Sequence, residues 1–154
     1  MRTRLDLDNY LPYLVNRVGS IMAEQYGTEA LAPYRLSIPM WRVMAALAST
    51  DVQRQVDLAV TTSIEVSTLS RIVTRLVHMG VMTRTRSASS TREVAVKLTA
   101  KGSAQVARLI PIARAYEVTA IAGLPTDELA VLKRCLRRVY ANMKKREVSA
   151  AAAE

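Results

Sequence analysis

The fold of this chain is decided by the stretch Ser67-Thr68-Leu69-Ser70-Arg71-Ile72-Val73-Thr74-Arg75-Leu76-Val77-His78-Met79. Read with a helical period, one side of this stretch is apolar, through Leu69, Ile72, Val73, Leu76 and Val77. The opposite side has no acid and consists of Ser67, Ser70, Arg71, Thr74, Arg75 and His78. A solvated helix usually mixes glutamate with lysine, whereas short side chains and hydrogen-bond donors suit a close approach to phosphates and base edges. The pattern therefore predicts a helix that contacts nucleic acid, with Thr68 adding a hydroxyl at its positive end.

The neighbouring residues predict a helix-turn-helix followed by a β-hairpin. A short helix is expected over Gln55–Thr62, with Val56, Leu58 and Ala59 turned inward, and a tight turn leads from it to the helix at 67–79. After Gly80 the hydrophobic period changes from about 3.6 to 2, which predicts strands over 81–86 and 92–98 around a polar connection at 87–91. Three arginines cluster near the tip of this hairpin, where they are suited to the DNA backbone or minor groove: Arg84, Arg86 and Arg92.

Helical patterns flank this region on both sides. On the amino-terminal side, we expect a helix capped by Asp8 that ends near Gly27, a loop over 28–38, and a helix opened by Ser37 and Pro39 that is broken at 49–51. On the carboxyl-terminal side, we expect a long helix capped by Thr99 and kinked at its internal proline, then an amphipathic helix from residue 126 and a frayed tail at 148–154. The fold class expected is mainly α with a small β-hairpin (α+β).

The composition limits the classes of partner and of chemistry. Twenty-two Lys and Arg against 13 Asp and Glu give a formal charge of +9, which suits nucleic acid or an anionic membrane, although charge alone establishes neither. No apolar run approaches the ~20 residues that span a bilayer, and residues 1–8 lack a signal pattern, so a cytoplasmic protein is expected. The single cysteine, Cys135, excludes an internal disulfide. Cys135 is interpreted as a packed thiol, with a redox sensor activated by neighbouring cations as the alternative.

No pattern in the sequence predicts catalysis. The chain has no Ser-His-Asp set, no paired-carboxylate pattern and no glycine-rich phosphate loop. His78 is the only histidine, and no cluster of His, Cys or acids has metal-ligand spacing. We therefore expect a protein that is not an enzyme and that has no metal site and no cofactor.

From about Ile38 to Gly102 the sequence resembles the MarR family of transcriptional regulators. The resemblance is carried by Trp41–Leu47, Asp57-Leu58-Ala59, Ser67–Leu76, Gly80-Val81-Met82, and Arg92 with Val94–Gly102. It implies a homodimer on a pseudo-palindromic operator in double-stranded DNA, a winged helix-turn-helix at 38–98, and helical dimerisation regions at 1–36 and 99–147, all within one domain, 1–154. It also implies control by small aromatic or phenolic effectors. One departure is Ser90, which stands where the family's wing usually carries an aspartate two residues before the arginine.

Two questions stay open at the level of sequence. An aromatic and methionine-rich neighbourhood on the first two helices is a candidate effector cleft, or else core and dimer-interface packing; its residues are Tyr13, Tyr34, Met40, Trp41 and Met44. The function expected is a sequence-specific DNA-binding transcriptional regulator, most readily a repressor. The alternatives are a ligand-independent DNA-binding protein and an adaptor that uses its winged domain to dock proteins.

Overall fold

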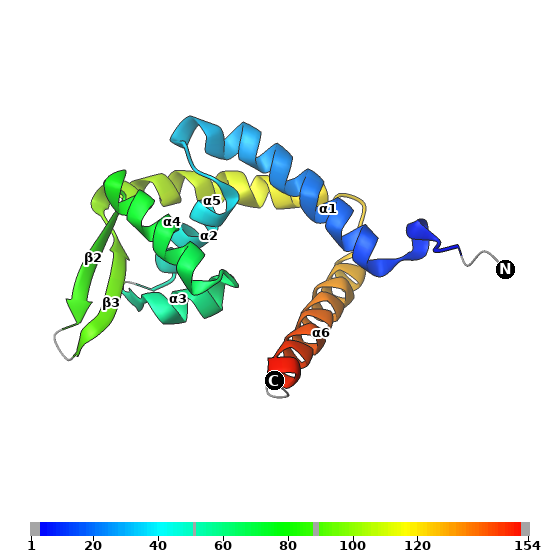
Figure 1. Cartoon of the computed structure of the whole chain (residues 1–154). Coiled ribbons are helices and arrows are strands. Elements are labelled where there is room, and N and C mark those ends of the chain that lie inside the picture. Colours follow the sequence, from blue (N-terminus) through cyan, green and yellow to red (C-terminus); the bar gives the residue numbers. More distant parts are fainter. Residues whose placement is uncertain (1–3, 51, 88–89, 152–154) are drawn as a thin grey trace. The chain divides into compact units, whose positions relative to one another are not determined.

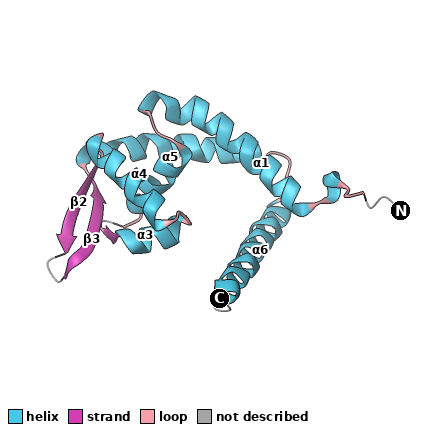
Figure 2. Ribbon diagram, in the orientation of Figure 1, coloured by secondary structure: helices cyan, strands magenta, loops and turns pink. Residues whose placement is uncertain are grey.

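The chain is mainly helical and carries one small antiparallel sheet, as expected from the sequence (Figures 1 and 2). The computed structural model describes residues 4–50, 52–87 and 90–151, of which 86–87, 90–93 and 147–151 are described by their backbone alone. Two compact units divide the chain, residues 1–116 and residues 117–154. Among the described residues, no helix combines the length and the apolar character that crossing a membrane requires.

The amino-terminal segment differs from the sequence expectation at both of its ends. Asp8 does not cap the first long helix, because it lies inside a 3-10 turn, Leu7–Asn9, which is capped by Asp6. Helix α1 follows at Leu11–Tyr26, with proline in its first turn. Gly27 keeps a right-handed helical conformation, so the chain continues through a π-helical segment, Gly27–Leu31, and a 3-10 turn, Ala32–Tyr34. The expected loop over 28–38 is therefore largely helical. Arg35, with φ of 55°, is the residue at which this helical segment ends.

The helix-turn-helix and the hairpin are confirmed. Helix α2 (Ile38–Ala48) starts at the Ser37 cap, and α3 (Gln55–Thr62) leads into α4 (Val66–His78). Strands β2 (Met82–Ser87) and β3 (Ser90–Leu98) pair antiparallel, with Met82 opposite Leu98. The sequence patterns missed β1 (Gln53–Arg54), which pairs with the other edge of β3, so that the sheet has the order β1-β3-β2.

The core lies behind α4. Leu58 of α3, Leu69, Val73 and Leu76 of α4, and Val96 of β3 are all buried within it. The expectation that Val56 turns inward is wrong, because its side chain is 61% exposed. At 3.6 residues per turn, Val56 lies nearly opposite Leu58 on the helix, and the buried side of α3 is completed by Ala59 and Thr62 instead.

Two helices complete the chain. Helix α5 (Ala100–Ala120) begins at Thr99, whose hydroxyl accepts a hydrogen bond from the Gly102 amide at 3.1 Å. Pro111 lies inside α5, and the kink expected there stays a prediction. Helix α6 (Thr126–Ala151) starts after a turn at Gly123 and extends to Ala151, into the segment 148–154 for which fraying is expected.

Candidate nucleic-acid interface

Helix α4 presents its acid-free side to solvent. Ser67, Thr68, Arg71, Thr74 and Arg75 are exposed, whereas Ser70 is half-buried at the edge of that side. The buried residues Leu69, Val73 and Leu76 fix the opposite side against the core. Because the helix is anchored along its length, the exposed side chains keep a fixed spacing, as a surface that reads DNA must.

Glu65 caps α4 and was not singled out by the sequence patterns, which placed the start of the helix at Ser67. Its carboxylate accepts hydrogen bonds from the amides of Ser67 and Thr68, each at 2.9 Å, and from the Ser67 hydroxyl. These hydrogen bonds lower the pKa of Glu65 to about 2, and the bond from the Ser67 hydroxyl has the largest effect. The signal available in the sequence was an acid directly before the helix, where a negative charge suits the positive end of the helix dipole.

The predicted DNA-contacting residues of α4 therefore divide into two groups. The Ser67 hydroxyl and the first amides of the helix are already engaged by Glu65. Arg71 and Arg75 lie one turn apart, are exposed, and carry the positive charge of this side of the helix. An arginine fork can bind two guanine edge atoms or phosphate oxygens, so these two side chains are the strongest candidates for DNA contact.

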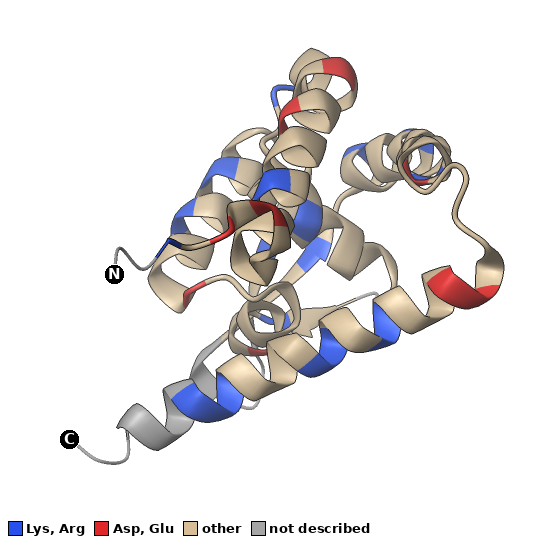
Figure 3. Cartoon of the chain, turned by 90° about the vertical axis from the view of Figure 1, so that its right-hand side faces the viewer, with Lys and Arg blue, Asp and Glu red and all other residues tan. Residues whose placement is uncertain are grey.

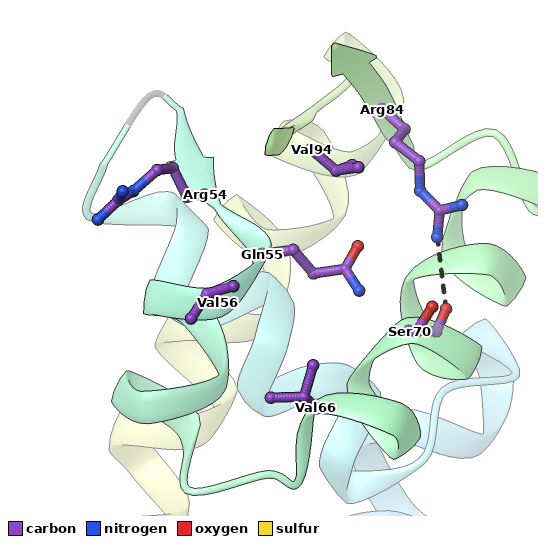
Figure 4. A pocket seen from close by; sticks show the side chains of 7 residues that line it. All are labelled: Arg54, Gln55, Val56, Val66, Ser70, Arg84 and Val94. Carbon is purple, nitrogen blue, oxygen red and sulfur yellow. Dashed lines mark hydrogen bonds between the residues drawn. The ribbon is translucent and has the colours of Figure 1, made fainter. Parts of the chain in front are cut away.

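Arg84 points from β2 toward α4. Its Nη2 atom lies 3.4 Å from the Ser70 carbonyl oxygen (Figure 4). The same atom donates to the Thr74 hydroxyl at 3.0 Å. The Thr74 hydroxyl in turn donates to the same Ser70 carbonyl oxygen at 2.9 Å. The structure thus brings together three predicted site residues, Ser70, Thr74 and Arg84, and joins the first strand of the wing to the exposed side of α4.

The tip of the wing, at residues 86–87 and 90–93, is described by its backbone alone. Arg86 pairs with Val94 in the β2–β3 ladder, and the register shifts between Arg86 and Ser87, which pairs with Ser90. The side chains of Arg86, Arg92 and Ser90 lie outside the described part of the structure. Their contacts with DNA, and the effect of a serine at position 90, stay predictions.

The carboxyl end of α4 is tied to the start of α5. The Thr99 hydroxyl donates to the Gly80 carbonyl oxygen at 2.8 Å, and Lys101 Nζ donates to the Met79 carbonyl oxygen at 2.9 Å. Gly102 lies so close that an added Cβ would be 2.0 Å from the Val81 carbonyl oxygen. Gly80, with φ of 70°, turns the chain from α4 into the hairpin. These contacts hold the carboxyl end of α4 in place.

A cleft of about 340 Å³ lies beside α4. It is lined by residues of β1, α3, α4, β2 and β3, and the lining includes Ser70 and Arg84 (Figure 4). A second cleft, of about 330 Å³, lies between the end of α2 and α5 and is lined mainly by apolar residues such as Leu47 and Val106. The five candidate effector-binding residues line neither cleft.

The structure places those five residues in different surroundings. Met40 and Met44 are buried in the core, while Tyr13, Tyr34 and Trp41 are half-buried. Trp41 joins a group of aromatic rings around Tyr26, whose ring centre is 6.2 Å from that of Trp41 and 5.5 Å from that of Tyr116. Burial raises the pKa of the Tyr26 phenol, and within the described residues its hydroxyl has no hydrogen-bond partner.

Helix α6 is amphipathic and basic. Asp127 and Glu128 lie in its first turn, and Lys and Arg recur along the rest of its described length (Figure 3). Cys135 is exposed on this helix, so the interpretation of Cys135 as a thiol packed in the core of its own chain is wrong.

A helix-turn-helix with an exposed cationic reading helix, followed by a hairpin with arginine, defines the class of winged helix-turn-helix DNA-binding proteins. Residues 36–94 match the family model of the MarR family. The chain is 27% identical over 132 residues to the HTH-type transcriptional repressor Rv2887 of Mycobacterium tuberculosis, covering 86% of this chain and 94% of that protein. The chain is thus a DNA-binding transcriptional regulator whose residues 36–94 carry a MarR-type domain.

Two solved structures agree with this assignment. The PcaV transcriptional regulator from Streptomyces coelicolor, in complex with its natural ligand, is similar with a TM-score of 0.80 and 25% identity, over 90% of this chain and 97% of that one. A mutant MarR from E. coli, complexed with operator DNA, is similar with a TM-score of 0.77 and 25% identity, over 84% of this chain and 92% of that one.

Proposed function

We propose that this protein is a homodimeric repressor that binds a pseudo-palindromic operator, with α4 of each copy in a major groove. The observation that carries the proposal is the exposed, acid-free side of α4, with Arg71 and Arg75 one turn apart and a buried apolar side behind them. Arg86 and Arg92 of the wing are assigned to the neighbouring backbone or minor groove. Repression is supported by the function in the name of the Mycobacterium tuberculosis relative.

The dimer is supported by apolar residues that the single chain leaves exposed. Helix α1 exposes five of them, Leu11, Leu14, Val15, Val18 and Ile21. Helix α6 exposes a second series, Leu132, Leu136, Val139, Tyr140 and Met143. Contiguous exposed apolar surface of this kind typically marks a protein–protein interface. A second copy of the chain is the occupant proposed, because two winged domains related by a two-fold axis match the symmetry of a palindromic site.

Duplex binding at increasing salt tests the DNA-binding part of the proposal. For a protein that neutralises Z phosphates, the logarithm of affinity falls with the logarithm of salt at a slope of about −0.9Z. We expect a steep negative slope, with a roughly thousandfold loss of affinity or more between 50 and 200 mM salt. A flat response, or no duplex binding at 50 mM salt, contradicts DNA binding through α4 and favours the protein-docking adaptor.

Arg71→Ala tests the assignment of α4 as the reading helix. This variant should weaken operator binding by at least about tenfold and leave the oligomeric state unchanged, because Arg71 lies on the exposed side of α4. Arg108→Ala removes the same charge from an exposed position on α5 and is the matched control. Equal losses of operator affinity in the two variants would mean that Arg71 contributes only its charge and makes no specific contact with the operator.

Release by a small aromatic or phenolic effector is the further part of the proposal. It is supported by the similarity to PcaV, which was solved with its natural ligand. The effector must bind the DNA-free and DNA-bound conformations with unequal affinity, since otherwise it cannot shift the equilibrium between them. A thermal-shift screen with phenolic acids, followed by operator release at saturating concentration, tests this. Binding that leaves operator affinity unchanged contradicts the effector role.

A further inference from the structure

The hydroxyl of Thr74 both donates and accepts a hydrogen bond within the protein, although Thr74 is exposed on the reading side of α4. It donates to the Ser70 carbonyl oxygen at 2.9 Å and accepts from Arg84 Nη2 at 3.0 Å. A hydroxyl has one hydrogen, so Thr74 has no donor left for an acceptor on a base edge. The hydroxyl keeps one lone pair, which can only accept a hydrogen bond, and the γ-methyl group is the part of Thr74 that can contact an apolar group on a base.

Arg84 holds this arrangement from outside the helix. Threonine in a helix divides between two rotamers, because its hydroxyl can bond a carbonyl of the preceding turn. Arg84 reaches across from β2, and its Nη2 atom lies near the Ser70 carbonyl oxygen (Figure 4). The same atom donates to the Thr74 hydroxyl. The guanidinium therefore stabilises the rotamer in which the hydroxyl is held against the helix. Arg84 itself is directed toward α4 by the same two contacts.

We propose that Arg84 is a positioning residue that holds the Thr74 hydroxyl against α4, and that the Thr74 methyl group reads the C5-methyl group of a thymine. Thymine alone among the four bases presents a methyl group in the major groove, and a threonine methyl is one of the groups that contact it. The proposal assigns a base preference to Thr74 and removes Arg84 from the set of phosphate contacts. It rests on the proposed function, in which α4 lies in the major groove.

Uracil substitution tests the methyl contact. The probe is a duplex selected from a randomised pool by the wild-type protein, in which each thymine is replaced singly by uracil, so that only the methyl group is lost. At one thymine of each half-site, uracil should weaken binding of the wild type by about fourfold, the equivalent of ~0.8 kcal/mol for one buried methyl group.

Two conservative variants of Thr74 separate its methyl group from its hydroxyl. Thr74→Ser keeps the hydroxyl and loses the methyl group, so the ratio of thymine to uracil affinity at that position should fall to about one. Thr74→Val keeps a methyl group and should keep the preference. A preference that survives in Thr74→Ser, or that is lost only in Thr74→Val, overturns the methyl contact. Loss of all duplex binding by the wild type at low salt overturns the proposed function itself.

The role of Arg84 is tested by the same ratio. Arg84→Ala should lower the thymine preference, and Arg84→Lys should restore it in part, because an ammonium group can also donate to the Thr74 hydroxyl. A phosphate contact would behave differently: Arg84→Ala would weaken the thymine and uracil duplexes equally and make the salt slope shallower by about one unit. That result would overturn the positioning role of Arg84. The methyl contact of Thr74 would then be tested only by Thr74→Ser and Thr74→Val.

Discussion

Glu65 determines how the reading helix begins. A carboxylate there neutralises part of the positive end of α4 and takes up the amides of Ser67 and Thr68. Because the charged form is the one that accepts these bonds, its pKa is lowered from 4.5 to about 2. A depressed pKa means that the stabilisation is present above pH 4.5 and is lost as the pH falls from there through about 2.

The Glu65→Gln variant should show this pH dependence directly. At pH 7 it should unfold at a lower denaturant concentration than the wild type, because a neutral amide accepts weaker hydrogen bonds and does not interact as favourably with the helix dipole. As the pH falls from about 4.5 toward 2, the difference should shrink, since Glu65 of the wild type becomes protonated. Glu24→Gln, at an exposed position inside α1, is the matched control. A difference that stays constant down to pH 2 would contradict the capping role.

Gly102 permits the close contact between α5 and the chain that leaves α4. An alanine Cβ would lie 2.0 Å from the Val81 carbonyl oxygen, so the backbone must move. Gly102→Ala should therefore lower the free energy of unfolding by about 1–3 kcal/mol. Gly27→Ala is the control, because Gly27 has a right-handed helical conformation and open space around it. It should be neutral or stabilising by up to ~1 kcal/mol, as measured by denaturant titration.

At the scale of elements, α1 and α6 are amphipathic helices whose apolar sides are exposed in the single chain. Leu132, Leu136, Val139 and Met143 recur on α6 at steps of three and four residues, the spacing of a helix that packs against another helix. The cations of α6 lie mainly outside this stripe, so the helix can bury its apolar side while its charges stay in water.

Leu136→Lys places a charge in this stripe and should weaken the proposed dimer. Because an unpaired ammonium group is costly to bury, we expect the dissociation constant of the dimer to rise by at least about tenfold. Sedimentation velocity at several protein concentrations measures it. Val60→Lys, at a position on α3 that is 77% exposed, should leave assembly unchanged. A monomeric wild type, or a fully dimeric Leu136→Lys variant, would refute the assignment of this stripe to the interface.

At the scale of the whole molecule, folding and association are expected to be coupled. If the dimer is the folded form, a tenfold increase in protein concentration adds about 1.4 kcal/mol to its stability, which for two chains unfolding together raises Tm by roughly 2 °C. Differential scanning calorimetry across a hundredfold concentration range checks this. The Leu136→Lys variant should lose the concentration dependence. A concentration-independent Tm for the wild type would indicate that the chain folds as a monomer.

The sequence by itself determined the helices α2 to α5, the hairpin and the acid-free side of α4. Each of these depends on residues close together in the chain, where the hydrophobic period reports which side is buried. It also determined the change of period at Gly80, which separates helix from strand.

Only the tertiary structure decided the contacts between residues far apart in the chain. Strand β1 is two residues long and exists because Gln53 and Arg54 pair with β3. A strand of this length is too short to show an alternating hydrophobic pattern in the sequence. The engagement of Thr74 by Arg84 likewise depends on where the hairpin packs against α4. Sequence alone counted both residues as DNA contacts because it shows charge and exposure, whereas a hydrogen bond between two elements is formed only when the fold brings them together.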